Sequence, residues 1–206
     1  MAVPPEEGVL YVAYGARAVR EAQESIGSLR AYHDWPVAVV GDEIAGAQHV
    51  GCPDRGMPGR WAKVNLLSLS PFDRTLYLDA DTRVHGKLDA GFRILDDGWE
   101  LVIVPSEGQS QPLHSLTDEE RRATQDELGD EWPLMLNTGV MWLRRTDGTE
   151  RLFAEWRREW ERFRLHDQGA LLRALEKRPV KVWLLGLDFN SHRGKVVEHR
   201  FGKARQ

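Results

Sequence analysis

Two aspartates, Asp79 and Asp81, follow a short apolar run that ends at Leu78. In an open α/β sheet, acids two positions apart at the carboxyl end of a buried strand can turn toward one point in the ligand-binding crevice. Two carboxylates this close repel each other unless a cation lies between them. Mg²⁺ or Mn²⁺ removes the repulsion and can bridge two phosphates. The spacing therefore predicts a metal and phosphate site, although an isolated Asp-x-Asp is also typical of acids that cap a following turn.

A basic segment near the carboxyl end offers further charged groups. Residues 189–206 carry five basic residues and one acid, Glu198, in a chain with a formal net charge of −4. The segment contains His199, and a neutral imidazole is a suitable third ligand beside two carboxylates, favouring Mn²⁺ somewhat over Mg²⁺. His192 is the alternative ligand. A solvated, frayed terminus is the competing interpretation of the whole segment.

The elements that must position these groups alternate between strand and helix. Apolar runs flank stretches with helical spacing, which is typical of a doubly wound, mostly parallel sheet. We expect one α/β domain over residues 1–206. The predicted strands cover residues 8–14, 37–40, 74–78, 100–104, 134–143 and 180–185. The first predicted helix has Ala18, Ala22, Ile26 and Leu29 at helical spacing. Three further helices are predicted over residues 61–69, 88–95 and 167–175. Two more are predicted to begin near residues 117 and 147.

Two helix starts and one helix face can be predicted in more detail. Thr117 and Glu120 have the spacing of a capping box, and Asp147 with Glu150 can cap a long helix. One face of that long helix is apolar and is expected to pack in the core rather than stack on sugar. Its members are Leu152, Phe153, Trp156, Trp160 and Phe163. Residues 105–133 have the least regular pattern and are expected to cross over the carboxyl edge of the sheet.

Composition limits the class of protein. The chain is 41% hydrophobic and 29% charged, which fits a folded core and argues against a disordered protein. No run approaches the roughly 20 apolar residues of a membrane span, and the start lacks the pattern of an export signal, so we expect a soluble, cytoplasmic protein. The negative net charge argues against a generally basic, nucleic-acid-coating surface. Cys52 is the single cysteine and is expected to be an ordinary buried or half-buried residue.

Four blocks of the sequence together resemble the GT-A fold glycosyltransferases, especially the retaining group that includes glycogenin and bacterial galactosyltransferases. The resemblance covers nearly the whole chain. The blocks are Val9 to Gly15, Lys63 through the Asp79-Ala80-Asp81 motif to Val84, Leu136 to Met141 with Asp167-Gln168, and His199-x-x-Gly202-x-x-Arg205. Arg205 stands where the group has lysine, a change that keeps the charge and permits bidentate binding of a diphosphate.

The resemblance implies a Rossmann-like α/β/α sandwich and transfer of a hexose or pentose from a nucleoside diphosphate, expected to be UDP. It also implies retention of configuration, with the metal on Asp79, Asp81 and His199. Gln168 and Asp167 are the expected catalytic residues, with Gln168 near the reacting carbon. Residues 189–206 are expected to close over the donor. The expected donor-binding residues are Ala13, Tyr14, Gly15, Lys63, Ala80, Asn137, Thr138, Gly202, Lys203 and Arg205.

Several alternatives stay open. The Asp-x-Asp string also resembles the first motif of haloacid-dehalogenase-type phosphatases, with Asp79 as nucleophile, although that motif normally lies on the first strand. A binding module could keep the nucleotide-sugar fold without turnover. An inverting enzyme would need a general base, for which Asp167 or Asp188 is the candidate. The acceptor can be a saccharide, a small molecule, a protein or a modified DNA base, and the oligomeric state is not predicted.

Overall fold

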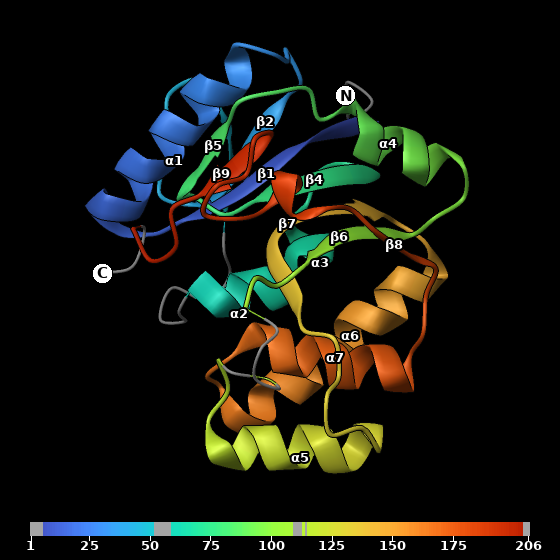
Figure 1. The fold of residues 1–206 in the computed structure, drawn as a ribbon. Helices are drawn as coiled ribbons and strands as arrows, with labels where there is room; N and C mark the ends of the chain where they lie inside the picture. Colours follow the sequence, from blue (N-terminus) through green and yellow to red (C-terminus); the bar gives the residue numbers. More distant parts are fainter. Residues whose placement is uncertain (1–5, 52–58, 109–112, 114, 204–206) are drawn as a thin grey trace.

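The computed structural model describes residues 6–51, 59–108, 113 and 115–203 (Figure 1). Its strands are β1 (Glu7–Ala13), β2 (Val37–Gly41), β3 (Gln48–Val50), β4 (Arg74–Leu78), β5 (Thr82–Val84), β6 (Leu101–Pro105), β7 (Leu136–Arg144), β8 (Val182–Leu184) and β9 (Val197–His199). Its helices are α1 (Gly15–Arg30), α2 (Gly59–Val64), α3 (Leu66–Leu69), α4 (Asp89–Asp96), α5 (Asp118–Leu128), α6 (Asp147–Phe163) and α7 (Asp167–Lys177), with a 3-10 turn at Leu187–Phe189.

Seven of the strands form one sheet in the order β3-β2-β1-β4-β7-β6-β8. Neighbouring strands pair in parallel except at β7, which is antiparallel to both β4 and β6. Helices α1 and α4 cover one face, and α2, α3, α6 and α7 cover the other, with α5 outside α7 (Figure 1). The predicted α/β/α sandwich with a mostly parallel sheet is therefore confirmed.

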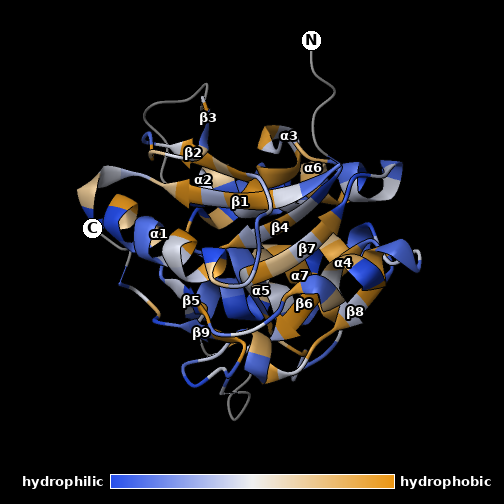
Figure 2. Ribbon diagram, turned by 90° about the horizontal axis from the view of Figure 1, so that it is seen from above, coloured by the Kyte–Doolittle hydropathy of each residue, from blue (hydrophilic) through white to orange (hydrophobic). Residues whose placement is uncertain are grey.

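The core lies on both faces of the sheet because the central strands carry apolar side chains toward both faces. On β1, Val9 and Tyr11 pack on the α1 side, whereas Leu10 packs on the opposite side. Successive side chains of a strand point to opposite faces, so a strand buried on both faces needs a continuous apolar run. Figure 2 shows this pattern, with hydrophobic residues gathered on the central strands and hydrophilic residues on the outer faces of the helices.

The predicted core strand at residues 180–185 is wrong in one respect. β8 forms the last strand of the sheet, beside β6, and the side chains of Trp183 and Leu184 are 41% and 44% exposed. An apolar run predicts a strand, but it does not show whether another element will cover that strand. The described residues place none beyond β8 in the sheet order.

The predicted helix at residues 61–69 is divided into α2 and α3. Asn65 leaves the helical conformation (φ −113°, ψ 10°), and its side-chain amide donates to the Trp61 carbonyl at 2.8 Å. An asparagine side chain competes with the helix for backbone groups, which explains the break. Lys63 and Asn65, at the end of α2 and at the break, are both buried.

The helix caps differ in detail from the prediction. Thr146, not Asp147, caps α6: its hydroxyl accepts from the Thr149 amide at 3.1 Å, and the Thr149 hydroxyl accepts in return from the Thr146 amide at 2.9 Å. Thr117 caps α5 as predicted, accepting from the Glu120 amide at 3.3 Å. The carboxylate of Glu120 does not complete the box, because it turns inward to a buried arginine of α7.

The predicted apolar face of the long helix is confirmed as core except at its last member, Phe163, which is half-buried at the end of α6. Leu152, Phe153, Trp156 and Trp160 are buried in the cluster on the α6 side of the sheet. The indole N–H of Trp156 donates to the Asp167 carbonyl at 2.7 Å, so this aromatic side chain also fixes the start of α7.

A small second sheet was not predicted. β9, close to the carboxyl end, pairs antiparallel with β5, which follows Asp81 directly, and His199 lies opposite Thr82. Figure 1 shows β9 in red beside β5 in green, close to α1.

The described helices include none with both the length and the apolar character needed to cross a bilayer.

Candidate metal centre

Asp79 and Asp81 lie at the carboxyl end of β4, in the centre of the large sheet. The Asp79 amide donates to the Gly139 carbonyl at 2.8 Å, which extends the pairing of β4 with β7. The Thr82 hydroxyl donates to the Asp79 carbonyl at 2.8 Å and closes a tight turn into β5. This turn places both carboxylates at the same edge of the sheet, as the two-residue spacing predicted.

His199 is brought to these acids by β9. The Arg200 amide donates to the Asp81 carbonyl at 2.9 Å, so the histidine is held beside the motif by backbone pairing. Its Nε2 atom lies 3.2 Å from Asp81 Oδ1 and 3.6 Å from Asp79 Oδ2, and the residue is 3% exposed. Among the described residues, these three form the group of acids and histidines whose ligand atoms lie within 4.8 Å of one another.

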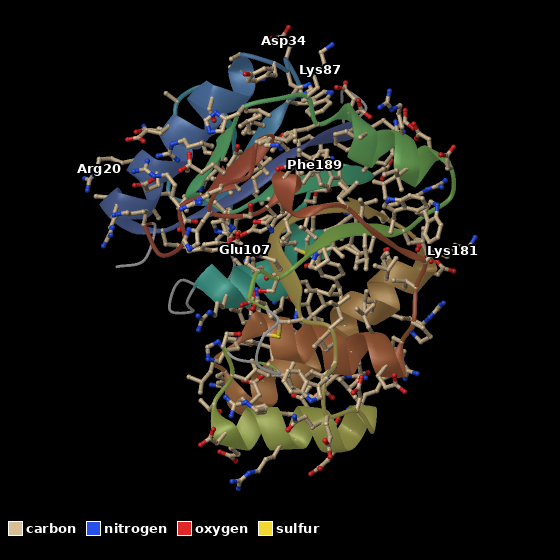
Figure 3. The ribbon with its side chains drawn as sticks, viewed as in Figure 1. Arg20, Asp34, Lys87, Glu107, Lys181 and Phe189 are labelled. Atoms are coloured by element: carbon tan, nitrogen blue, oxygen red, sulfur yellow. The ribbon has the colours of Figure 1, made fainter. Side chains whose placement is uncertain are left out.

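The alternative ligand, His192, lies elsewhere. It is exposed, its amide donates to the Glu107 carboxylate at 3.1 Å, and its ring packs edge-on against Phe201. The structure thus brings His199, and not His192, to the two aspartates. Glu107 itself lies near the middle of the molecule (Figure 3).

Each member of the Asp79, Asp81 and His199 cluster has a second partner that sets its direction. Tyr77 donates its hydroxyl to Asp79 Oδ1 at 2.5 Å, and the Lys203 amide donates to Asp81 Oδ2 at 3.0 Å. His199 Nδ1 lies 2.7 Å from the side-chain oxygen of Asn190. Ligands of protein-bound metals are generally held by such outer contacts.

Gly139 provides the space that this cluster occupies. A Cβ atom at this position would lie 2.3 Å from His199 Cε1 and 2.9 Å from Asp79 Oδ2. Both distances are far below van der Waals contact, and the histidine ring is rigid. The glycine of the Asn-Thr-Gly string is therefore explained by close approach of β7 to the cluster.

Lys63 supplies a buried positive charge beside the cluster. Its Nζ atom lies 2.8 Å from Asp79 Oδ1 and 3.5 Å from Asp167 Oδ2. Burial lowers the pKa of Lys63, but the two carboxylates raise it by more, so its pKa lies above the ordinary value. Lys63 is therefore a fixed cation.

Asp167 is a fixed anion, because its neighbours lower its pKa by more than burial raises it. Burial raises its pKa, but Lys63, a hydrogen bond from the Thr138 hydroxyl and the charge of Arg60 lower it by more. The pKa of Tyr77 is raised well above its usual value by burial and by Asp79, so its hydroxyl stays protonated as a donor. The site thus holds one fixed anion, Asp167, and two permanent donors, Lys63 and Tyr77.

No family model matches the sequence. The search among curated proteins also found no match. Solved structures do match the fold. GlyE of Streptococcus pneumoniae TIGR4, a glycosyltransferase, superposes with a TM-score of 0.60 at 15% identity, over 89% of this chain and 46% of GlyE. Mouse xyloside xylosyltransferase 1 superposes with a TM-score of 0.61 at 12% identity, over 97% of this chain and 99% of that chain.

A third solved structure, the galactosyltransferase LgtC in complex with donor and acceptor sugar analogs, gives a TM-score of 0.59 at 15% identity. The alignment covers 95% of this chain and 87% of LgtC. The chain has the GT-A glycosyltransferase fold. This confirms the resemblance drawn from the four sequence blocks.

Within the GT-A fold, the first predicted donor block lies at the ends of β1 and β2. The Asp42 amide donates to the Ala13 carbonyl at 2.8 Å, and the Gly15 amide donates to Asp42 Oδ2 at 2.7 Å. Gly15 has φ 81°, a conformation that glycine adopts without strain. Ala13, Tyr14 and Gly15 therefore form a fixed edge at the carboxyl ends of two parallel strands.

The second part of the predicted donor site lies on β7 and α7. Asn137 accepts from the Gly139 amide at 3.0 Å, at a point where the register between β6 and β7 shifts. Gln168 lies in the first turn of α7, with its Oε1 atom 3.4 Å from the Ser115 hydroxyl. Asp167, which precedes it, is not the helix cap, because His166 occupies that position.

The remaining predicted residues are distributed as follows. Ala80 is buried between the two aspartates, and Gly202 (φ 82°) and Lys203 lie in the turn that follows Arg200 and Phe201 after β9. Arg205 lies outside the described residues. The alternative base Asp188 is exposed in the 3-10 turn, and its carbonyl accepts from the Val196 amide at 2.9 Å.

Two residues that contact the cluster were not given roles by the sequence. Tyr77 lies two positions before Asp79 on the same strand, so period-two spacing was a signal that could have identified it. Asn190 carried no such signal, because its contact with His199 depends on the path of the intervening turn.

Proposed function

We propose that this protein is a metal-dependent glycosyltransferase that moves a sugar from a nucleoside diphosphate, expected to be UDP, to an acceptor. The observation that carries the proposal is the convergence of Asp79, Asp81 and His199 at the carboxyl end of β4 in a chain with the GT-A fold. The LgtC structure, which contains donor and acceptor sugar analogs, supports the assignment of the same reaction class.

The residues of the cluster fit a divalent cation. Two carboxylate oxygens and one imidazole nitrogen are a donor set that accepts Mn²⁺ or Mg²⁺ and favours Mn²⁺. Gly139 keeps the space beside these atoms clear, and the outer contacts of all three ligands are in place. A bound ion would neutralise charge that develops on the departing diphosphate.

The chain's own cations are expected to stabilise the negative charge that develops on the departing diphosphate. Fixed positive groups that face a leaving group lower the barrier because they interact most strongly when its charge is greatest. We assign Lys203 and Arg205 to the diphosphate, and Gly202 to close approach of the backbone. On this proposal, residues 189–206 close over the donor, and residues 1–206 act as one donor-binding unit.

Gln168 and Asp167 are proposed to act at the sugar. The ionised state of Asp167 and its pairing with Lys63 argue for a role in holding the sugar and the lysine, rather than for a base with a raised pKa. We propose transfer with retention: the bond from the anomeric carbon to the phosphate oxygen breaks and the acceptor oxygen bonds to the same face. The departing phosphate oxygen takes the acceptor's proton. Gln168 lies beside the reacting carbon, and Asn137 and Thr138 border the sugar.

The test is release of UDP from a panel of UDP-sugars in the presence of Mn²⁺. We expect Asp81→Asn and His199→Gln to lower release by about 100-fold or more, the order found when one group that stabilises a transition state is removed. Glu119→Gln, a change on the exposed face of α5, serves as the matched control and should leave release unchanged.

Two outcomes would replace the proposal. Tight, metal-dependent UDP binding without release from any donor would identify a binding module. Hydrolysis of simple phosphomonoesters, reduced more by Asp79→Asn than by His199→Gln, would identify a phosphatase.

A further inference from the structure

We propose that Asn190 is a positioning residue that fixes which nitrogen of the His199 ring carries the proton, an inference that rests on the metal centre proposed above. Asn190 lies at the end of the 3-10 turn, nine positions before His199, and it is fully buried. Its side chain contacts two groups. Oδ1 lies 2.7 Å from His199 Nδ1, and Nδ2 lies 3.2 Å from the Asn137 carbonyl oxygen.

The two contacts together determine the orientation of the amide. A backbone carbonyl oxygen can only accept a hydrogen bond, so the NH₂ group of Asn190 must face Asn137. The amide oxygen of Asn190 must then face the histidine ring. That oxygen also can only accept, so Nδ1 of His199 must be the protonated nitrogen.

When the ring is neutral, Nε2 then directs its lone pair toward the two carboxylates. Nε2 lies 3.2 Å from Asp81 Oδ1 and 3.6 Å from Asp79 Oδ2. A cation bound between the lone pair and the carboxylates would accept all three as ligands. The protonation set by Asn190 therefore prepares Nε2 as a metal ligand.

Other contacts restrain the ring but do not choose the protonated nitrogen. Phe201 stacks on the ring with 3.9 Å between centroids, and Gly139 approaches its Cε1 edge. Both are van der Waals contacts, and they would be the same for either tautomer. Without Asn190, the proton can move to Nε2 and donate to Asp81, which would occupy the ligand position.

The test combines two measurements. In the metal-free protein, the ¹⁵N chemical shifts of the His199 ring, assigned with His199→Gln, report the tautomer. Mn²⁺ titration followed by electron paramagnetic resonance reports affinity. We expect Nδ1 to carry a proton in the unchanged protein. Asn190→Leu, which keeps the size but removes the acceptor, should let this proton move to Nε2 and should weaken Mn²⁺ binding about 10- to 100-fold.

Two variants serve as comparisons. Asn190→Asp keeps an acceptor toward Nδ1, and it should therefore keep the tautomer and bind Mn²⁺ nearly as well as the unchanged protein. Thr124→Val removes another buried polar group, one that contacts Glu120 and Arg173 away from the cluster. It should change thermal stability without changing either readout.

The outcomes separate this inference from the proposed function. A ring protonated on Nε2 and not on Nδ1 in the unchanged protein would overturn the role of Asn190, and this result needs no variant to fold. Mn²⁺ binding that is equally tight in Asn190→Leu would overturn it as well, while leaving the metal centre intact. Failure of the unchanged protein to bind Mn²⁺ would instead overturn the metal centre itself.

Discussion

At the scale of single residues, Lys63 is the cation that pairs with two acids, the buried Asp167 and the partly exposed Asp79. Its Nζ atom lies within 3.5 Å of both Asp79 and Asp167, and its side chain is 11% exposed. Charges removed from water are tolerated only when they are paired, so the lysine and the acids stabilise one another's ionised forms. The lysine is therefore part of the structure of the site as well as a candidate donor-binding group.

We predict that Lys63→Met lowers the free energy of unfolding by about 3 kcal/mol in metal-free protein, because it leaves two acids partly buried without their partner. Urea denaturation followed by circular dichroism measures this change. Lys63→Arg should recover part of the loss. Lys181→Met is the control, since Lys181 extends from the outer edge of the molecule (Figure 3). Equal stability of Lys63→Met and the unchanged protein would contradict the prediction.

At the scale of elements, α5 is attached to the molecule by polar groups. Its buried side chains are Glu120 and Thr124. Both contact the guanidinium of Arg173 on α7, which is fully buried and also bonds Glu159 of α6 at 2.8 Å. Burial raises the pKa of Glu120 in spite of Arg173. One arginine thus joins three helices.

Arg173→Met should destabilise the protein by about 3 to 5 kcal/mol, since it leaves the carboxylates of Glu120 and Glu159 buried without this partner. Adding Glu120→Gln to this variant should restore part of the stability, because the uncharged amide costs less to bury. Arg122→Met, at an exposed position of α5, is the matched control. The midpoint of urea unfolding measures the stability of all three variants. Equal midpoints for Arg173→Met and Arg122→Met would refute the role of Arg173.

A second ion-pair group joins the same helices near their ends and makes a prediction about pH. Hydrogen bonds from Arg162 and Lys177 lower the pKa of Glu127 to about 2, against the opposing effect of burial. The unfolded chain, with the ordinary value of 4.5, binds the proton more readily. The stability contributed by Glu127 is therefore complete above about pH 4.5 and is lost as the pH falls toward 2.

Glu127→Gln tests this contribution. The variant should be less stable than the unchanged protein at about pH 6, by less than about 1 kcal/mol because the pair is open to solvent. The difference should disappear near pH 2. Urea midpoints across this range measure it, and a difference that grows on acidification would show that the assigned direction is wrong.

At the scale of the whole molecule, the candidate site exists only when distant parts of the chain meet. β9 pairs with β5, and Arg200 contacts Glu24 of α1 at 3.7 Å. Arg83 of β5 also pairs with Glu21 of α1. The carboxyl-end segment is thus held by strand pairing and by α1, and Figure 1 shows β9 beside β5 and close to α1. Its ligand-bearing part, His199, is fixed by the backbone pairing of β9 with β5.

This arrangement predicts that metal binding and donor binding can be separated. Lys203→Ala with Arg205→Ala should leave Mn²⁺ affinity unchanged, because β9 still holds His199. The same double variant should weaken UDP binding in the presence of Mn²⁺ by about 10- to 100-fold, as expected for loss of charged hydrogen bonds. Isothermal titration measures both affinities.

The matched control for this double variant is Arg193→Ala with Lys195→Ala, which removes the same charge from the segment before β9. It should leave UDP affinity nearly unchanged. Equal weakening in both double variants would indicate a general effect of charge and would contradict the assignment of Lys203 and Arg205.

The sequence by itself determined the features that depend on local periodicity. The apolar run before Asp79 predicted β4 at residues 74–78, and the face that contains Trp156 and Trp160 predicted the buried side of α6. Spacing of two also placed Asp79 and Asp81 at one edge of the sheet. These predictions succeeded because the direction of a side chain relative to its own strand or helix is set within a few residues.

Only the tertiary structure decided the features that depend on which elements become neighbours. It placed β8 at an exposed edge, chose His199 over His192, and brought Asn190 to the histidine and Lys63 to Asp167. Each pair is separated in sequence by turns or by whole elements, and the packing of the sheet against its helices fixes their contact. A local pattern indicates which chemistry a residue can perform, whereas the free energy of the whole fold determines which residues it contacts.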